Sequence, residues 1–144
     1  MTFDETIELM LGLYKSNPKN RPWKIGLYVE TKMWQFYLEN YGENIAQMTY
    51  DVLRKYDLES IAKCENKLPI IIECFEGGSL MHFSNITDLP LIYLMNENYT
   101  TAMTMLPQIA TYVHGIGPTQ SLIFKPNFMT LAHSLDLQVH PYTL

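Results

Sequence analysis

The chain has 144 residues, of which 47% are hydrophobic and 17% charged, and its formal net charge is −5. This composition is typical of a globular domain and excludes an intrinsically disordered chain. The acidic balance, with no run of Lys or Arg, argues against nucleic acid or an anionic membrane surface as the main partner. No apolar stretch approaches the roughly 20 residues that cross a bilayer, so no transmembrane segment is predicted.

The first half of the chain predicts two helices and a strand. Thr2-Phe3-Asp4-Glu5 has the pattern of a capping box that opens a helix, and Asn17-Pro18 would end it. The segment 24–30 is predicted as a strand, and the apolar spacing from Ile45 to Tyr56 predicts a longer helix. The aromatic-rich segment 34–41 between them is expected to be a loop.

The second half predicts four more strands. Two apolar, β-branched runs, Pro69–Cys74 and Pro90–Leu94, are typical of buried parallel strands. The segments 114–116 and 137–139 are shorter strand candidates, and Pro107 and Pro126 are each expected to open a helix. Cys64 and Cys74 lack metal-type spacing and are expected to be free thiols, one on a loop and one in a strand.

The order of the predicted elements sets the fold class. A helix followed by repeated β-α units implies an α/β protein with a parallel sheet and helices outside it. Five strands would suffice for a doubly wound open sheet, whereas a (β/α)₈ barrel needs eight. No phosphate-cradling glycine motif follows the first strand, which weakens the dinucleotide-binding alternative.

Candidate chemistry lies where the strands end. The first strand ends in Glu30-Thr31-Lys32, and alternation places Glu30 and Lys32 on the same side. A carboxylate and an ammonium group suit a divalent cation beside a phosphate, although an exposed salt bridge is the commoner explanation of such a pair. Glu73, near the end of the next strand, either points into a barrel or is a charge at its rim.

The last strand runs into His140-Pro141-Tyr142-Thr143. Pro141 removes a backbone donor, so the strand is expected to stop there. Two side chains that exchange protons or hydrogen bonds, His140 and Tyr142, then stand at its carboxyl end, where α/β barrels carry their active sites. His140 suits an acid, a base or a ligand, but a lone histidine is commonly structural.

Four motifs together resemble the carboxyl-terminal part of the glycerophosphodiester phosphodiesterase family. In the family's order they are 28–32 (Tyr-Val-Glu-Thr-Lys), 71–76 (Ile-Ile-Glu-Cys-Phe-Glu), 114–118 (His-Gly-Ile-Gly-Pro) and 139–143 (Val-His-Pro-Tyr-Thr). The resemblance covers nearly the whole chain and implies part of a (β/α)₈ TIM barrel, about strands four to eight with their helices. Residues 1–144 would then be a domain region that is incomplete at both ends.

The resemblance also implies roles for five residues. Glu30 matches a carboxylate that ligates the catalytic Ca²⁺ or Mg²⁺, and Lys32 matches a catalytic lysine that contacts the phosphate. Phe75 and Tyr142 match aromatic positions that line the substrate pocket, and His140 is grouped with these substrate-binding residues. The second motif departs from the usual Gln-Ser-Phe, because the chain has Glu73-Cys74-Phe75 there.

The family's other catalytic elements are not in this sequence. Family members have a His-Arg-Gly strand, a Glu-x-Asp pair that completes the metal site, and a second catalytic histidine. Their two histidines act as acid and base on a metal-bound glycerophosphodiester and release glycerol 3-phosphate and an alcohol. We therefore expect the enzyme activity to belong to a longer protein and the isolated chain to be inactive.

Several alternatives stay open. A non-catalytic remnant that binds a partner or metabolite, or a related barrel phospholipase, would share this pattern. A chain with uncovered sheet edges is also expected to self-associate. The last motif favours a secreted or endomembrane-lumenal location over the cytoplasm, while the composition leaves the compartment open.

Overall fold

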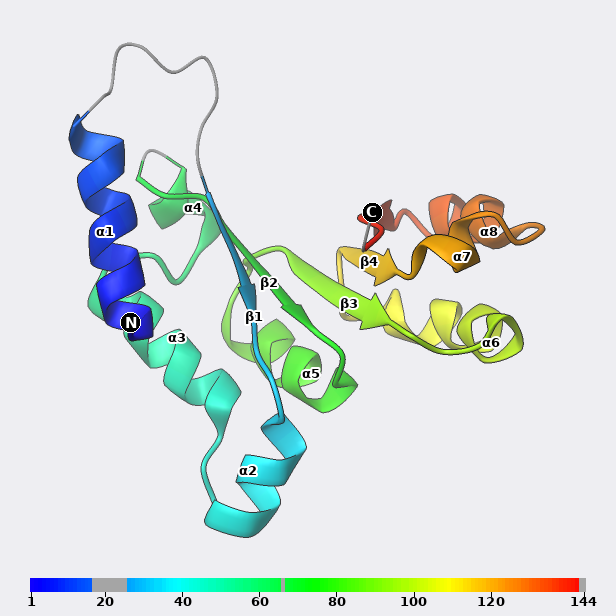
Figure 1. The fold of residues 1–144 in the computed structure, drawn as a ribbon, viewed down its shortest axis with the longest axis horizontal. Helices are drawn as coiled ribbons and strands as arrows, with labels where there is room; N and C mark the ends of the chain where they lie inside the picture. The colour runs from blue at the N-terminus through cyan, green and yellow to red at the C-terminus, as the bar shows by residue number, and fades with distance from the viewer. Residues whose placement is uncertain (17–25, 66, 143–144) are drawn as a thin grey trace.

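The computed structural model describes residues 1–16, 26–65 and 67–142, and its centre is a five-stranded sheet (Figure 1). The strands follow one another in sequence order and all neighbours are parallel. They are β1 (Leu27–Glu30), β2 (Ile70–Cys74), β3 (Leu91–Met95), β4 (Gly115–Pro118) and β5 (Gln138–Val139). The predicted parallel α/β architecture is therefore confirmed.

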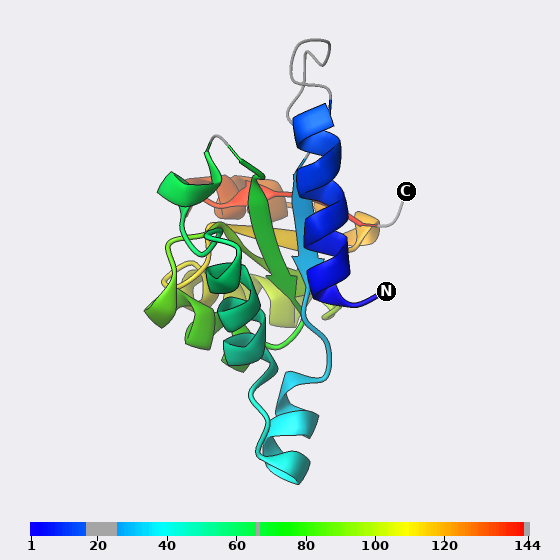
Figure 2. The same cartoon turned by 90° about the vertical axis from the view of Figure 1, so that its left-hand side faces the viewer.

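One helix precedes β1, and the others lie in the connections between the strands. They are α1 (Phe3–Ser16), α2 (Trp34–Tyr41), α3 (Ile45–Lys55), α4 (Ile61–Cys64), α5 (Gly77–Ile86), α6 (Tyr99–Ile109), α7 (Gln120–Ile123) and α8 (Phe128–Ser134). Figure 2 shows α1 beside α3 near β1, where Tyr56 donates a hydrogen bond to Glu8 at 2.7 Å. Within the described part of the chain, no helix is both long and apolar enough to span a bilayer.

The sheet has two chemically different faces. The outer face carries Ile72, Cys74, Leu91 and Met95, which are fully or almost fully buried and belong to the main core. The inner face carries the alternate residues, and β4 contributes only glycines there. A Cβ on Gly117 would lie 2.6 Å from a methyl group of Leu94, so the glycine leaves room for that side chain to lie flat on the inner face.

The sheet is strongly curled. Four interstrand spacings of about 4.8 Å would separate β1 from β5 by roughly 19 Å in a flat sheet, beyond the combined reach of two side chains. The Tyr28 hydroxyl nevertheless lies 2.7 Å from Nδ1 of His140, which follows β5. The two outer strands therefore face each other across a hollow, as strands do inside a barrel.

The stagger of the strands also matches a barrel. One row in register crosses the whole sheet: Glu30, Glu73, Ile92, Gly115 and Gln138. Tyr28 lies two residues before Glu30, so in this register it is level with position 136, two residues before Gln138. Its hydrogen-bond partner, His140, lies four residues beyond position 136. An eight-stranded barrel of shear eight shifts neighbouring strands by about one residue each, or roughly four residues over four steps.

The structure corrects several local predictions. The aromatic segment predicted as a loop is helix α2. Pro107 lies inside the last turns of α6, which begins at Tyr99 with Asn98 as its N-cap, so it does not open a helix. Pro126 precedes α8 by two residues, and Cys64 ends helix α4 instead of lying on a loop.

Other local predictions are confirmed. The capping box forms, because Glu5 N donates to Thr2 Oγ1 at 3.2 Å and Thr2 N donates to Glu5 Oε2 at 2.7 Å. Both cysteines are buried free thiols. The strand does end before Pro141, although pairing resumes once beyond it, where Tyr142 N donates to Pro118 O at 3.1 Å. The predicted helix end at Asn17-Pro18 and the strand residues before Gly26 lie outside the described residues.

Candidate active site

Three charged side chains gather at the carboxyl ends of β1 and β2. Lys32 Nζ lies 2.8 Å from Glu30 Oε2, and Glu30 is in register with Glu73 on the neighbouring strand. The ion pair raises the pKa of Lys32. Burial, followed by the negative charge of Glu30, raises the pKa of Glu73. One ammonium group therefore faces two carboxylates, which gives this edge of the sheet a local negative charge.

Buried contacts fix the backbone that carries these charges. Thr31 N donates to the carbonyl of Glu73 at 3.1 Å, and the Cys74 thiol donates to the carbonyl of Thr31 at 3.0 Å. The buried Thr31 hydroxyl lies 3.1 Å from the Ser79 hydroxyl on α5. The ends of β1 and β2 are consequently held to each other and to the helix behind them.

Glu76 holds the loop that follows Lys32. Its carboxylate accepts hydrogen bonds from Trp34 N at 2.5 Å and from Gln35 N at 3.3 Å. These are first-turn backbone donors of α2 that lack partners within the helix, and a negative charge is favourable there. A residue from the β2–α5 connection therefore supplies the cap that α2 lacks locally, since Met33 makes no side-chain cap bond.

An aromatic pair lies at the same carboxyl end of the sheet as the three charged side chains. The rings of Phe75 and Tyr142 meet edge to face with centroids 5.6 Å apart. The Tyr142 hydroxyl donates to the carbonyl of Met95 at 3.0 Å, which fixes the ring against the end of β3. Burial, and then the charges of Glu97 and Glu30, raise the pKa of Tyr142, so the phenol stays neutral near neutral pH.

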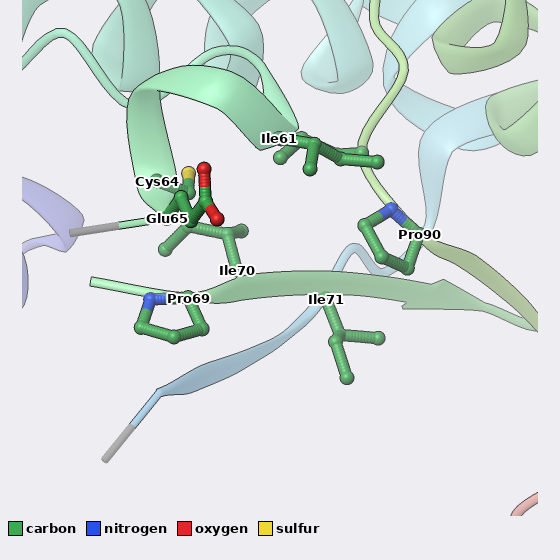
Figure 3. A pocket seen from close by; sticks show the side chains of 8 residues that line it. Ile61, Cys64, Glu65, Pro69, Ile70, Ile71 and Pro90 are labelled. Atoms are coloured by element: carbon green, nitrogen blue, oxygen red, sulfur yellow. The ribbon is translucent and has the colours of Figure 1, made fainter. Parts of the chain in front are cut away.

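A cavity of about 320 Å³ lies among some of these side chains. It is lined by Glu30, Thr31, Lys32, Met33, Cys74, Phe75 and Glu76. A second cavity, of about 340 Å³, lies at the opposite end of β2 between that strand and α4 (Figure 3). Ile61 and Ile70 approach this second space, whereas Ile71 points away from it towards the inner face. Its lining includes one charged residue, Glu65, whereas the first cavity is lined by three, Glu30, Lys32 and Glu76.

The donor set at the carboxyl end fits one side of a cation site. Glu30 and Glu73 offer the hard oxygen ligands that Ca²⁺ and Mg²⁺ prefer, but these ions take about six or more ligands. In the regions that the structure describes, no group of three or more His, Cys, Asp or Glu is arranged to hold a metal ion.

Comparison with known proteins agrees with this geometry. No family model matches the chain. The chain is similar to the glycerophosphodiester phosphodiesterase GDPD6 of Arabidopsis thaliana, with 31% identity over 170 residues. The match covers 99% of this chain and 44% of that relative, so the chain spans less than half of the relative's length. The chain is related to the glycerophosphodiester phosphodiesterase family over a partial region.

The glycerophosphodiester phosphodiesterase relationship agrees with the fold. Five parallel strands in sequence order, curled and staggered as in a barrel, form part of a (β/α)₈ barrel. The matched 170 residues exceed the 144 of this chain, so the relative carries insertions with respect to it.

The structure brings the five predicted site residues to the expected end of the sheet. Glu30 contacts Lys32, Phe75 contacts Tyr142, and the ring of His140 faces the inner surface of the sheet, where it meets Tyr28. Their roles as metal ligand, catalytic lysine and substrate-binding residues stay predictions.

Two residues in this region were missed by sequence reasoning. Tyr28 lies on a four-residue strand and its partner is 112 positions away, so no local pattern identifies the contact. Glu76 ends the 71–76 motif, but its capping partners on α2 lie more than 40 positions earlier. The lack of a local capping side chain before 34–41 is the sequence signal for a distant carboxylate.

Proposed function

We propose that this chain provides one half of the active site of a metal-dependent glycerophosphodiester phosphodiesterase. The observation that carries the proposal is the contact of Lys32 with Glu30, beside Glu73, at the carboxyl end of a curled parallel sheet. The products would be glycerol 3-phosphate and an alcohol. The relationship to an enzyme with this name over nearly the whole chain supports the reaction class.

Each side chain has a role that suits its chemistry. Lys32, whose side chain is 70% exposed, would exchange its contact with Glu30 for a phosphate oxygen of the substrate. Phe75 and Tyr142 would bind the glycerol moiety through their ring edges, and His140 would hydrogen-bond the same ligand. Glu30 would ligate Ca²⁺ or Mg²⁺ together with residues outside this sequence, and the ion would supply Lewis-acid charge to the phosphate.

The isolated chain is proposed to be inactive. The His-Arg-Gly and Glu-x-Asp elements that the resemblance leads us to expect are not among its 144 residues. Without the family's two catalytic histidines, the chain lacks the acid–base pair of the family reaction. The same fact favours a second candidate, a binding domain that retains the phosphate-contacting lysine but performs no chemistry.

The exposed sheet edges support a further part of this proposal. β1 and β5 are the outer strands of the sheet, and unpaired strand edges readily accept another chain. The chain on its own would therefore self-associate, and the part of the protein that completes the barrel would suppress this. Light scattering after size-exclusion chromatography would measure the mass, and a stable monomer would contradict this part of the proposal. A secreted or lumenal location stays a prediction.

The function is tested by complementation. The chain is purified alone and after co-expression with the part of the Arabidopsis relative that lies outside the match, and glycerol 3-phosphate release from glycerophosphocholine is measured with Ca²⁺ or Mg²⁺. We expect turnover only from the combination. Lys32→Gln should lower it by about 10²–10³-fold, the usual loss when one charge-stabilising group is removed.

Lys67→Gln is the matched control, because Lys67 also pairs with a carboxylate, that of Asp57, but away from this cavity. The control should keep its activity. Turnover by the isolated chain would refute the half-site proposal. A folded combination that binds glycerophosphocholine without hydrolysing it would favour the binding domain.

A further inference from the structure

A hydrogen bond crosses the hollow of the sheet below the candidate site. The Tyr28 hydroxyl lies 2.7 Å from Nδ1 of His140, and the two rings are 5.9 Å apart with their planes inclined at 51°. The backbone of His140 is fixed as well, because its N–H donates to the carbonyl of Ile116 at 2.8 Å. Both ends of this contact therefore start from paired strand backbone.

The chemistry of the two groups sets the direction of the hydrogen bond. A tyrosine phenol has an ordinary pKa of about 10 and is protonated at neutral pH. It is therefore the natural donor to the imidazole nitrogen 2.7 Å away. A neutral imidazole that accepts at Nδ1 carries its proton on Nε2, because one ring nitrogen is the donor when the other is the acceptor.

The position of the pair within the barrel places it beneath the charged groups. With a stagger of about one residue per strand, Tyr28 and His140 share a level across the hollow. Glu30 and Tyr142 are each two residues further along and share the next level towards the carboxyl end. A ligand held by Lys32 would rest above the imidazole. Across the described ranges, Nε2 of His140 makes no hydrogen bond to protein, so it is available as a donor.

We propose that Tyr28 is a positioning residue that holds His140 in the Nε2–H tautomer, so that the imidazole offers a fixed donor to an oxygen of the ligand. The identity of that oxygen, a phosphate oxygen, rests on the proposed function, whereas the tautomer does not. In this arrangement Tyr28 does not touch the ligand and acts only through His140. A purely structural contact across the hollow would leave the ligand response of His140 independent of the phenol.

The tautomer is measured by NMR. In ¹⁵N-labelled chain, long-range ¹H–¹⁵N correlation spectra near neutral pH report which ring nitrogen of His140 carries the proton. We expect protonated Nε2 and an unprotonated Nδ1 whose resonance is displaced by the accepted hydrogen bond. Tyr28→Phe should abolish that displacement and let the tautomer ratio drift towards that of a free histidine. Tyr37→Phe is the control, since Tyr37 lies on α2 among other aromatic rings and should change nothing.

A ligand titration separates this inference from the proposed function. In the labelled chain combined with the part of the Arabidopsis relative that completes the site, glycerol 3-phosphate should shift the Nε2 resonance of His140. Tyr28→Phe should weaken this response by about fivefold, the typical effect of one hydrogen bond. A His140 that keeps the Nε2–H form but ignores glycerol 3-phosphate would support the positioning by Tyr28 and contradict the proposed function.

Two results would overturn the inference. One is a wild-type His140 protonated on Nδ1, which needs no variant to be detected. The other is a Tyr28→Phe spectrum identical to the wild type.

Discussion

Gly115 tests the packing of the inner face against β5. A Cβ added at this residue would lie 2.7 Å from the carbonyl oxygen of Gln138 and 2.9 Å from Cδ1 of Ile92. The isoleucine methyl can rotate away, but the carbonyl belongs to the paired backbone of β5 and cannot. Gly115→Ala should therefore push β5 away from β4. Overpacking costs about 1–3 kcal/mol, and each weakened ladder hydrogen bond adds about 1 kcal/mol.

The expected loss is about 2–4 kcal/mol of unfolding free energy, a large part of the roughly 5–15 kcal/mol of a typical domain. At about 2–4 °C per kcal/mol for a chain of this size, the melting temperature should fall by roughly 10 °C. Thermal unfolding followed by circular dichroism measures this loss. The Nδ1 resonance of His140 should also change, because the residue follows the displaced strand.

Two further Gly→Ala variants provide a graded series. Gly117→Ala should cost less than Gly115→Ala, since the nearest atom, 2.6 Å away, is a side-chain methyl of Leu94 and the His140 carbonyl is 3.3 Å away. Gly12→Ala on the exposed face of α1 meets nothing within 4 Å and should stabilise the chain by up to about 1 kcal/mol. A Gly115→Ala protein that melts at or above the wild-type temperature would refute the reasoning.

Three other predictions concern local electrostatics and thiols. Glu76→Ala should destabilise the chain by about 1 kcal/mol and shift the tryptophan fluorescence of α2, whereas the exposed Glu39→Ala should not; equal effects would contradict the cap. Cys64 and Cys74, 4% and 1% exposed, should react with Ellman's reagent only after unfolding, and burial also raises the pKa of Cys64 to about 11. Two lysine partners lower the pKa of Asp57 to about 2 from 3.8, so its stabilisation is present above pH 3.8 and is lost as the pH falls through 2. The free energy of unfolding of Asp57→Asn, measured with urea, should fall less steeply between pH 3.8 and 2 than that of the wild type. An equally steep fall would contradict the ion pairs.

The sequence determined the class of fold and the end of the sheet that carries the chemistry. Apolar, β-branched runs such as Pro69–Cys74 are typical of buried parallel strands between helices. In a parallel sheet every strand ends at the same edge, so Glu30 and Tyr142 had to face the same end. Alternation alone predicted that Glu30 and Lys32 share a side, and they form an ion pair there.

The tertiary structure decided which of these side chains meet. The partnership of Glu30 with Glu73 depends on the register of two strands whose paired residues are 43 positions apart, and a shift of one residue would turn one carboxylate to the outer face. The contact of Tyr28 with His140 needs the curl and stagger of all five strands together. Helix α2 is fixed by a carboxylate more than 40 residues away, which is why its sequence alone suggested a loop. Such long-range contacts have no local signature, because they follow from closing the sheet and not from the propensity of any segment.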